Sequence, residues 1–98
     1  MKYTFPALLI PENDYYLVKF PDIPNCFTDG DNMADAILKG EDALSLILWG
    51  MEKDNETMPV PSAAGKIQVP AGAILTYIAA DTEPVSRIND TRAVRKNV

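Results

Sequence analysis

The first thirty residues alternate short apolar runs with turn residues, and this pattern predicts three β-strands. Residues 2–10 and 15–20 are rich in aromatic and branched side chains, which favour extended backbone. The Pro-Glu-Asn-Asp segment between them is typical of a hairpin turn, because proline fixes φ and asparagine or aspartate tolerates tight turns. A short third strand is expected around 26–28, closing at Asp29 and Gly30, where the glycine is expected to supply a positive φ. These elements indicate an antiparallel meander.

From Asn32 onward the apolar residues recur every three or four positions, which predicts one α-helix of about 20 residues. Asn32, with Asp35 three positions later, is typical of a capped helix start. Gly40 weakens a helix by roughly 1 kcal/mol relative to alanine, so its presence indicates that the helix lies close to the sheet there. The apolar stripe consists of Met33, Ala36, Ile37, Gly40, Ala43, Leu44, Ile47, Leu48 and Met51.

One more strand is predicted in the second half of the chain. Pro59 and Pro61 exclude residues 54–66 from helix and from sheet interior, so this stretch is expected to be a surface loop. Residues 73–80 form a compact apolar run, typical of a buried central strand, which we expect to lie beside the first strand. The predicted fold class is therefore α+β, a β-β-β-α-β domain over residues 1–82 with one long helix packed on the sheet. Residues 83–98 are polar and are expected to form a linker.

Charge is distributed unevenly along this single domain. The 98 residues have a net charge of −5. Residues 1–86 contain five lysines and thirteen acidic residues, a net charge of −8, whereas residues 87–98 have a net charge of +3. An acidic body repels nucleic acid and attracts a basic partner, because the summed charge steers encounter.

Several kinds of chemistry lack the residues that they require. The chain has no histidine, which rules out Ser-His and Cys-His nucleophiles. The single cysteine, Cys26, permits no disulfide within the chain and is expected to be a core residue. No stretch approaches the roughly 20 apolar residues that a bilayer requires, and the amino terminus does not resemble a signal peptide. We therefore expect a cytoplasmic protein without membrane association.

The acidic residues allow one catalytic hypothesis. Asp22, Asp29 and Asp31, with Glu41 or Asp81, offer the oxygen ligands that Mg²⁺ prefers, and a metal-dependent nuclease would use Asp22, Asp29 and Asp81. Their spacing fits no calcium loop, and aspartates in turns and caps commonly bond to the local backbone. We favour the interpretation that these aspartates bond to the local backbone, so we expect no bound metal, no cofactor and no enzyme activity.

The segment from Phe20 to Asn32, with the helix and the later prolines, resembles the HicB family of antitoxins. Members follow a pattern of Phe-Pro-Asp-Leu-Pro-Gly-Cys-Phe-Thr-x-Gly-Asp, an alanine-rich helix and Pro-x-Pro-Ser. Asn25 replaces the usual glycine, which asparagine can do because it tolerates left-handed φ. The positions that match are Phe20, Pro21, Asp22, Ile23, Pro24, Cys26, Phe27, Thr28, Gly30, Asp31, Ala43, Pro59, Pro61 and Ser62.

The resemblance implies a partial ribonuclease H-like fold without that fold's nuclease site. It also implies a partner, a small basic mRNA-cleaving HicA toxin that the antitoxin neutralises. Within the motif, Phe20 and Phe27 are expected to face the core. The candidate toxin-binding residues are Asp22, Pro24, Thr28, Asp29 and Asp31.

Longer family members continue into a DNA-binding domain that recognises the operator of their own operon. Residues 92–98 resemble the first strand of a truncated ribbon-helix-helix domain, with Arg92, Arg95 and Lys96 as candidate DNA-binding residues. Operator binding is expected only where such a domain is present. A homo-oligomer is expected as well, since the strand at 26–28 or the tail strand can pair between chains. A self-associating regulatory domain without a toxin partner remains an alternative.

Overall fold

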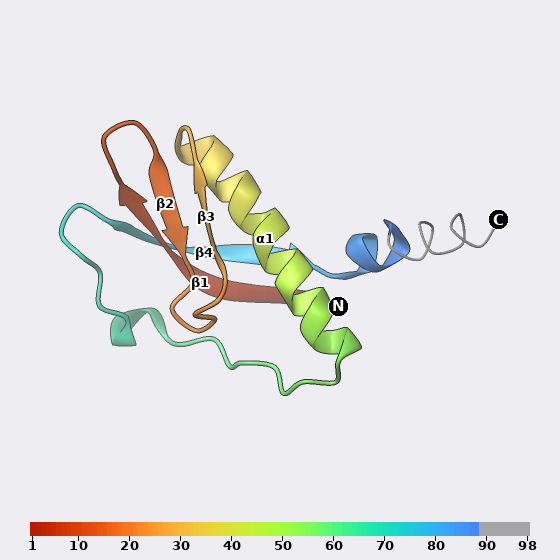
Figure 1. Cartoon of the computed structure of the whole chain (residues 1–98). Coiled ribbons are helices and arrows are strands. Elements are labelled where there is room, and N and C mark those ends of the chain that lie inside the picture. Colours follow the sequence, from red (N-terminus) through yellow and green to blue (C-terminus); the bar gives the residue numbers. More distant parts are fainter. Residues whose placement is uncertain (89–98) are drawn as a thin grey trace.

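The computed structural model describes residues 1–88 and contains a four-stranded antiparallel sheet with one long helix across one face (Figure 1). The strand order is β3-β2-β1-β4. The predicted β-β-β-α-β order and α+β class are confirmed. The elements are β1 (Lys2–Pro11), β2 (Tyr16–Lys19), β3 (Phe27–Gly30), α1 (Met33–Lys53), a 3₁₀ turn (Ala64–Lys66) and β4 (Ile74–Asp81).

The core lies between the sheet and α1. Helical residues at intervals of four, Ala36, Gly40, Leu44 and Leu48, are buried against the sheet, as the apolar stripe predicts. Gly40 permits the close approach that we expected, because a Cβ atom there would lie 2.9 Å from Ile78 Cδ1. The sheet, with the residue that follows β2, contributes Phe5, Ala7, Leu9, Val18, Phe20, Ile78 and Ala80.

Both ends of α1 are capped by hydrogen bonds. Asn32 Oδ1 accepts a hydrogen bond from the Asp35 amide at 2.8 Å, which confirms the predicted start. In a standard capping box, the side chain of the third helical residue accepts a hydrogen bond from the N-cap amide. Here Asp35 Oδ2 instead accepts from the amide of Asp31, one residue before the N-cap, at 2.9 Å. At the other end Asn55 has a φ of 56°, and the amides of Asn55 and Glu56 donate to the carbonyls of Glu52 and Met51. This is a Schellman ending with asparagine at the left-handed position, and it satisfies carbonyls that helix ends otherwise leave unpaired.

The apolar run at 73–80 does not form a central strand, so this part of the prediction was wrong. It does lie beside β1, pairing from Lys2 with Asp81 to Leu9 with Ile74, but β4 is the outermost strand of the sheet. Only Ile78 and Ala80 of this strand are buried. The error arises because apolar composition indicates whether the two faces of a strand are covered by other side chains. It does not indicate whether the strand has a neighbouring strand on each side.

Three details of the predicted loop region also differ. Phe20 is buried, but Phe27 is 66% exposed, because Cys26 fills the inward position next to it. Gly30 and Asn25 do not have the positive φ that we expected. Gly30 is instead required by contact: a Cβ atom there would lie 2.3 Å from the Ala36 backbone nitrogen.

The chain leaves the sheet through a second helical segment. Residues 83–88 are helical and extend away from the end of β4 (Figure 1). The predicted tail strand, with Arg92, Arg95 and Lys96, lies outside the described residues. In the part of the chain that the structure describes, no helix is long and apolar enough to cross a membrane.

Candidate protein-binding surfaces

The loop between β2 and β3 is connected to the rest of the domain by hydrogen bonds. Asp22 accepts two hydrogen bonds from Ser62, one from its amide at 2.8 Å and one from its hydroxyl at 2.5 Å. Ser62 in turn accepts a hydrogen bond at its carbonyl from the Tyr77 hydroxyl, at 2.8 Å. The Asp and Ser of the motif, forty positions apart, therefore meet in space. Asp22 is engaged inside the chain, and its carboxylate organises the loop.

The other predicted contact residues are spread around this loop. Pro24 and Asp29 are exposed, and Asp29 lies opposite Leu17 on the sheet face away from α1. Thr28 is half-buried and lies opposite Val18, on the helix side of the sheet. Asp31 is exposed just before α1. The structure therefore brings Pro24 and Asp29 to the outer surface, but it does not gather the five residues into one patch.

An apolar groove lies beside the loop, on the sheet face away from α1. Its volume is about 570 Å³, and Phe27 forms an exposed part of its wall. Exposed aromatic residues beside apolar grooves are typical of protein interfaces. The prediction of an inward Phe27 missed this feature. The lining residues are Leu8, Leu17, Lys19, Phe20, Pro21, Pro24, Cys26 and Phe27.

Cys26 is a core residue, as predicted. Its side chain is buried, and burial raises the pKa of the thiol to about 11, because the thiolate would lose its hydration. A thiol with so high a pKa is a poor nucleophile at neutral pH. The cysteine of the motif therefore packs under the loop and carries no reactive chemistry.

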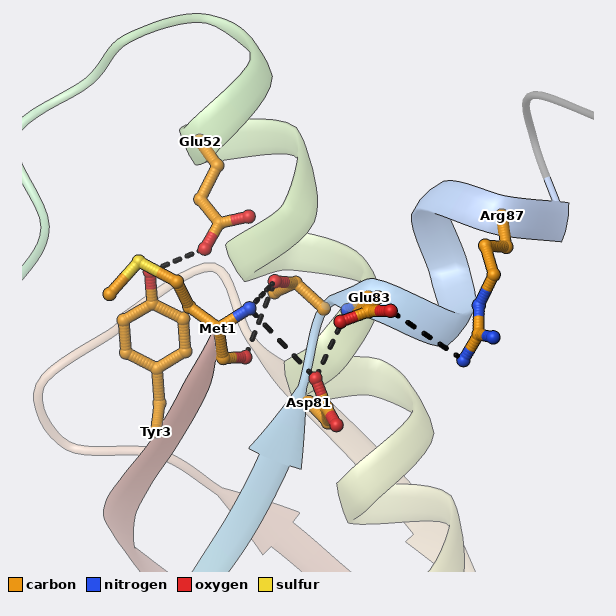
Figure 2. A network of polar contacts seen from close by, with 7 residues as sticks. Met1, Tyr3, Glu52, Asp81, Glu83 and Arg87 are labelled. Atoms are coloured by element: carbon orange, nitrogen blue, oxygen red, sulfur yellow. Dashed lines mark hydrogen bonds and ion pairs between the residues drawn. The ribbon is translucent and has the colours of Figure 1, made fainter.

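A polar cluster joins the start of β1, the end of α1 and the segment after β4 (Figure 2). The Tyr3 hydroxyl donates a short hydrogen bond of 2.5 Å to Glu52 Oε2. The Thr82 amide donates to the Met1 carbonyl at 3.0 Å, and Glu83 forms an ion pair with Arg87 at 3.9 Å within the helical segment. These contacts fix the direction in which residues 83–88 leave the body.

The bond between Tyr3 and Glu52 shifts the pKa of both groups. The hydrogen bond to Glu52 raises the pKa of Tyr3 to about 12, with smaller effects from burial and from the negative charge. The same bond lowers the pKa of Glu52. Because the neutral phenol is the favoured form, its contribution to stability is complete below pH 10 and is lost as the pH rises towards 12. Ionised Glu52 contributes at neutral pH and loses its contribution on acidification.

Replacing Tyr3 should remove the tyrosine ionisation step that occurs at high pH. In absorbance titration of the folded chain, we expect one phenol to ionise near pH 12, and we expect Tyr3→Phe to lose that step. Tyr15→Phe, which removes an exposed tyrosine, should retain it. A Tyr3→Phe titration that still shows the late step would contradict the assigned hydrogen bond.

The carboxylates of the nuclease hypothesis do not converge. Asp22 lies in the loop after β2, Asp29 on β3 and Asp81 at the end of β4, and β3 and β4 are opposite edges of the sheet. Among residues 1–88, no group of three histidine, cysteine or acidic side chains is placed to hold a metal ion. The arrangement therefore gives the nuclease hypothesis no support.

Comparison with known proteins decides the family. The family model described as the HicB-like antitoxin of bacterial toxin–antitoxin systems matches residues 5–98. The chain belongs to this family. Antitoxin HicB 1 of Photorhabdus laumondii is 38% identical to this HicB-like chain over 63 residues, which are 63% of the chain and 41% of that antitoxin. An uncharacterised 14.9 kDa protein of Haemophilus phage HP1 is 38% identical over 55 residues, 56% of the chain and 41% of its own length. The HicB-like chain therefore matches less than half the length of these relatives.

A solved structure confirms the fold of the HicB-like domain. It is a chain of a toxin–antitoxin complex from Streptococcus pneumoniae, with a TM-score of 0.78, 18% identity, and coverage of 87% of this chain and 73% of that one. At this identity the likeness concerns the fold. The matching family model itself describes antitoxins of bacterial toxin–antitoxin systems.

Proposed function

We propose that this chain is an antitoxin that binds and neutralises a small basic, mRNA-cleaving HicA-like toxin. The observation that carries the proposal is family membership over nearly the whole chain. Two physical features support it. The body is acidic over residues 1–86, which favours encounter with a basic, RNA-binding protein. The loop after β2 is held by Asp22 and two prolines, so little ordering entropy is lost when a partner binds there.

A form of the protein that carries a C-terminal DNA-binding domain would also regulate its own operon. Antitoxin HicB 1 of Photorhabdus laumondii is more than twice as long as the segment that it matches, which leaves room for a DNA-binding domain in that antitoxin. Arg92, Arg95 and Lys96 would belong to that part of the molecule. A net charge of +3 over residues 87–98 is too small for specific DNA recognition by itself, which normally combines several phosphate contacts with a groove-reading element. We therefore assign toxin binding to the body, and operator binding only to a form that carries a C-terminal DNA-binding domain.

Toxin binding can be measured directly. The basic protein encoded by the reading frame next to this one should bind the chain in titration calorimetry, and the chain should prevent that protein from cleaving RNA. We expect a Kd below about 1 µM, equivalent to about −8 kcal/mol, with weakening at higher salt because the attraction is electrostatic. Failure to bind, with an unchanged circular dichroism spectrum, would remove the antitoxin assignment. It would favour the self-associating regulatory domain instead.

The predicted contact residues provide the matched variants. Asp29→Asn and Asp31→Asn together remove two exposed charges from β3 and the turn after it, without touching the bond from Asp22 to Ser62. If the β3 edge of the sheet contacts the toxin, this double variant should weaken binding by tenfold or more. Asp14→Asn, in the exposed turn between β1 and β2, serves as a control for a charge change elsewhere.

A further inference from the structure

The outer edge of β4 lacks the features that usually protect an edge strand. Edge strands normally carry lysine, proline or a bulge, because their unpaired backbone groups recruit other chains. β4 has the sequence ILTYIAAD, with no lysine and no proline, and it pairs with β1 without interruption over eight residues. No other strand among residues 1–88 lies on its outer side. An eight-residue strand whose composition is typical of a central strand therefore lies at an edge of the sheet, and its outer backbone groups pair with no other strand of the described chain.

The register shows which backbone groups are unpaired. The Thr82 amide donates to the Met1 carbonyl, so this pair is hydrogen-bonded, and hydrogen-bonded pairs alternate along an antiparallel ladder. Pro6, which has no N–H group, lies opposite Tyr77 in one of the intervening pairs, as the alternation requires. The amides and carbonyls that point outward are therefore those of Leu75, Tyr77, Ala79 and Asp81.

A groove follows the second half of this edge. Its volume is about 750 Å³, and its walls are the start of β1, the end of β4, the middle of α1 and the apolar side chains of the segment 83–88. Glu41 and Asp42 of α1 line it together with Asp81, whereas Lys2 is the one basic side chain among the lining residues. Neither Glu41 nor Asp42 forms an ion pair within residues 1–88. The open backbone edge is thus accompanied by two carboxylates that form no ion pair within residues 1–88. We call this site the β4 edge groove.

We propose that the β4 edge groove takes an extended basic segment of the toxin partner, which adds a fifth strand to the sheet. This inference rests on the proposed function and assigns a location to it. Main-chain hydrogen bonds to Tyr77, Ala79 and Asp81 would supply affinity, as in other cases of strand addition. Lysine or arginine side chains of the added strand would pair with Glu41 and Asp42 and select for a basic partner.

A second copy of this chain fits the groove less well. Its own β4 contains no basic residue, so pairing two copies along this edge would remove water from Glu41 and Asp42 without providing a counter-charge. A basic partner meets both requirements, a strand for the edge and positive charge for the groove. The groove also lies at the opposite edge of the sheet from β3 and the loop that sequence reasoning selected.

Amide hydrogen exchange of the unaltered chain tests the proposal directly. In the free chain, the amides of Thr76, Ile78 and Ala80 should exchange slowly because they bond to β1, whereas those of Tyr77, Ala79 and Asp81 should exchange fast. Saturation with the basic protein encoded by the adjacent reading frame should slow these three outward amides at least tenfold. This alternation is specific to strand addition, because a contact between side chains alone would not produce it.

A charge variant provides the second measurement. Glu41→Gln with Asp42→Asn should weaken binding of the same protein at least tenfold, and this loss should shrink at high salt. The matched control is Asp54→Asn with Glu56→Gln, which makes the same change in charge beyond the end of α1, outside the groove. We expect the control to change Kd less than threefold.

Each other outcome overturns the proposal and is distinguishable. Tight binding with unchanged outward amides would place the toxin elsewhere and leave the proposed function intact, whereas absence of binding would remove both. Slow outward amides in the free chain that become fast on dilution would show that a second copy occupies the edge. Slow outward amides at every concentration, becoming fast when the chain is ended at residue 88, would show that residues 89–98 occupy it.

Discussion

Replacing Gly30 with alanine is expected to destabilise the domain by about 3 kcal/mol, at the upper end of the usual cost of overpacking. The added Cβ atom would lie 2.3 Å from the Ala36 nitrogen and 2.4 Å from Ala36 Cα. Both are backbone atoms of the first turns of α1, so no rotation of a side chain can relieve the clash. β3 and α1 would have to separate, although the Gly30 φ itself is acceptable for alanine.

Gly50→Ala is the matched control for this experiment. Nothing lies within 4 Å of the position that its Cβ atom would take, and the residue is inside α1. Alanine there should stabilise the helix by roughly 1 kcal/mol, because glycine has greater conformational freedom in the unfolded chain. Urea unfolding followed by circular dichroism at 222 nm measures both variants. A Gly30→Ala midpoint equal to that of the unaltered chain would show that β3 and α1 are not in contact there.

Elements that depend on local sequence were predictable. The helix was recognisable because nine apolar residues share one face and Asn32 and Asp35 mark its start, and all of this information lies within twenty residues. The hairpin of β1 and β2 was recognisable for the same reason, since the turn is adjacent to both strands. Gly40 was also interpretable, because a glycine inside an otherwise strong helix has few explanations other than close packing.

Features that depend on tertiary arrangement were not predictable from the pattern alone. The outward direction of Phe27 depends on which residue of a four-residue strand faces α1, and so short a strand has too few alternating positions to fix it. The bond from Asp22 to Ser62 joins residues forty positions apart. The family motif contains both residues, but no local rule connects them.

The location of β4 is the most informative difference for function. Apolar composition correctly predicted a strand next to β1, but the neighbour that would make β4 central is not part of residues 1–88. A conflict between local composition and observed position often marks a functional site. Here the conflict and the unpaired acids of the β4 edge groove occur together. The two observations are independent, since one concerns the strand and the other concerns α1.

Leu44→Ala is expected to cost about 2–5 kcal/mol of stability, as other large-to-small changes in protein cores do. Leu44 is completely buried in the middle of α1, within the core cluster between helix and sheet. Leu46, two positions away on the same helix, is 56% exposed, so Leu46→Ala should change stability by less than about 0.5 kcal/mol. Urea unfolding of the two variants separates the effect of burial from that of helix propensity. A similar loss at both positions would mean that the face of α1 against the sheet is wrongly assigned.

The same variant connects folding with the proposed binding. Domains of this size are stable by only about 5–15 kcal/mol, so Leu44→Ala removes a large part of the total. A partner that binds only the folded chain adds stability, about 2.7 kcal/mol when its free concentration is a hundred times Kd. Excess toxin should therefore raise the unfolding midpoint of Leu44→Ala substantially, since Leu44 is buried and does not touch the β4 edge groove. The midpoint of the variant can also stay the same in the presence of a protein that binds the unaltered chain. In that case the variant has lost the bound conformation as well as stability. The surface that the toxin recognises would then depend on the packing of α1 against the sheet.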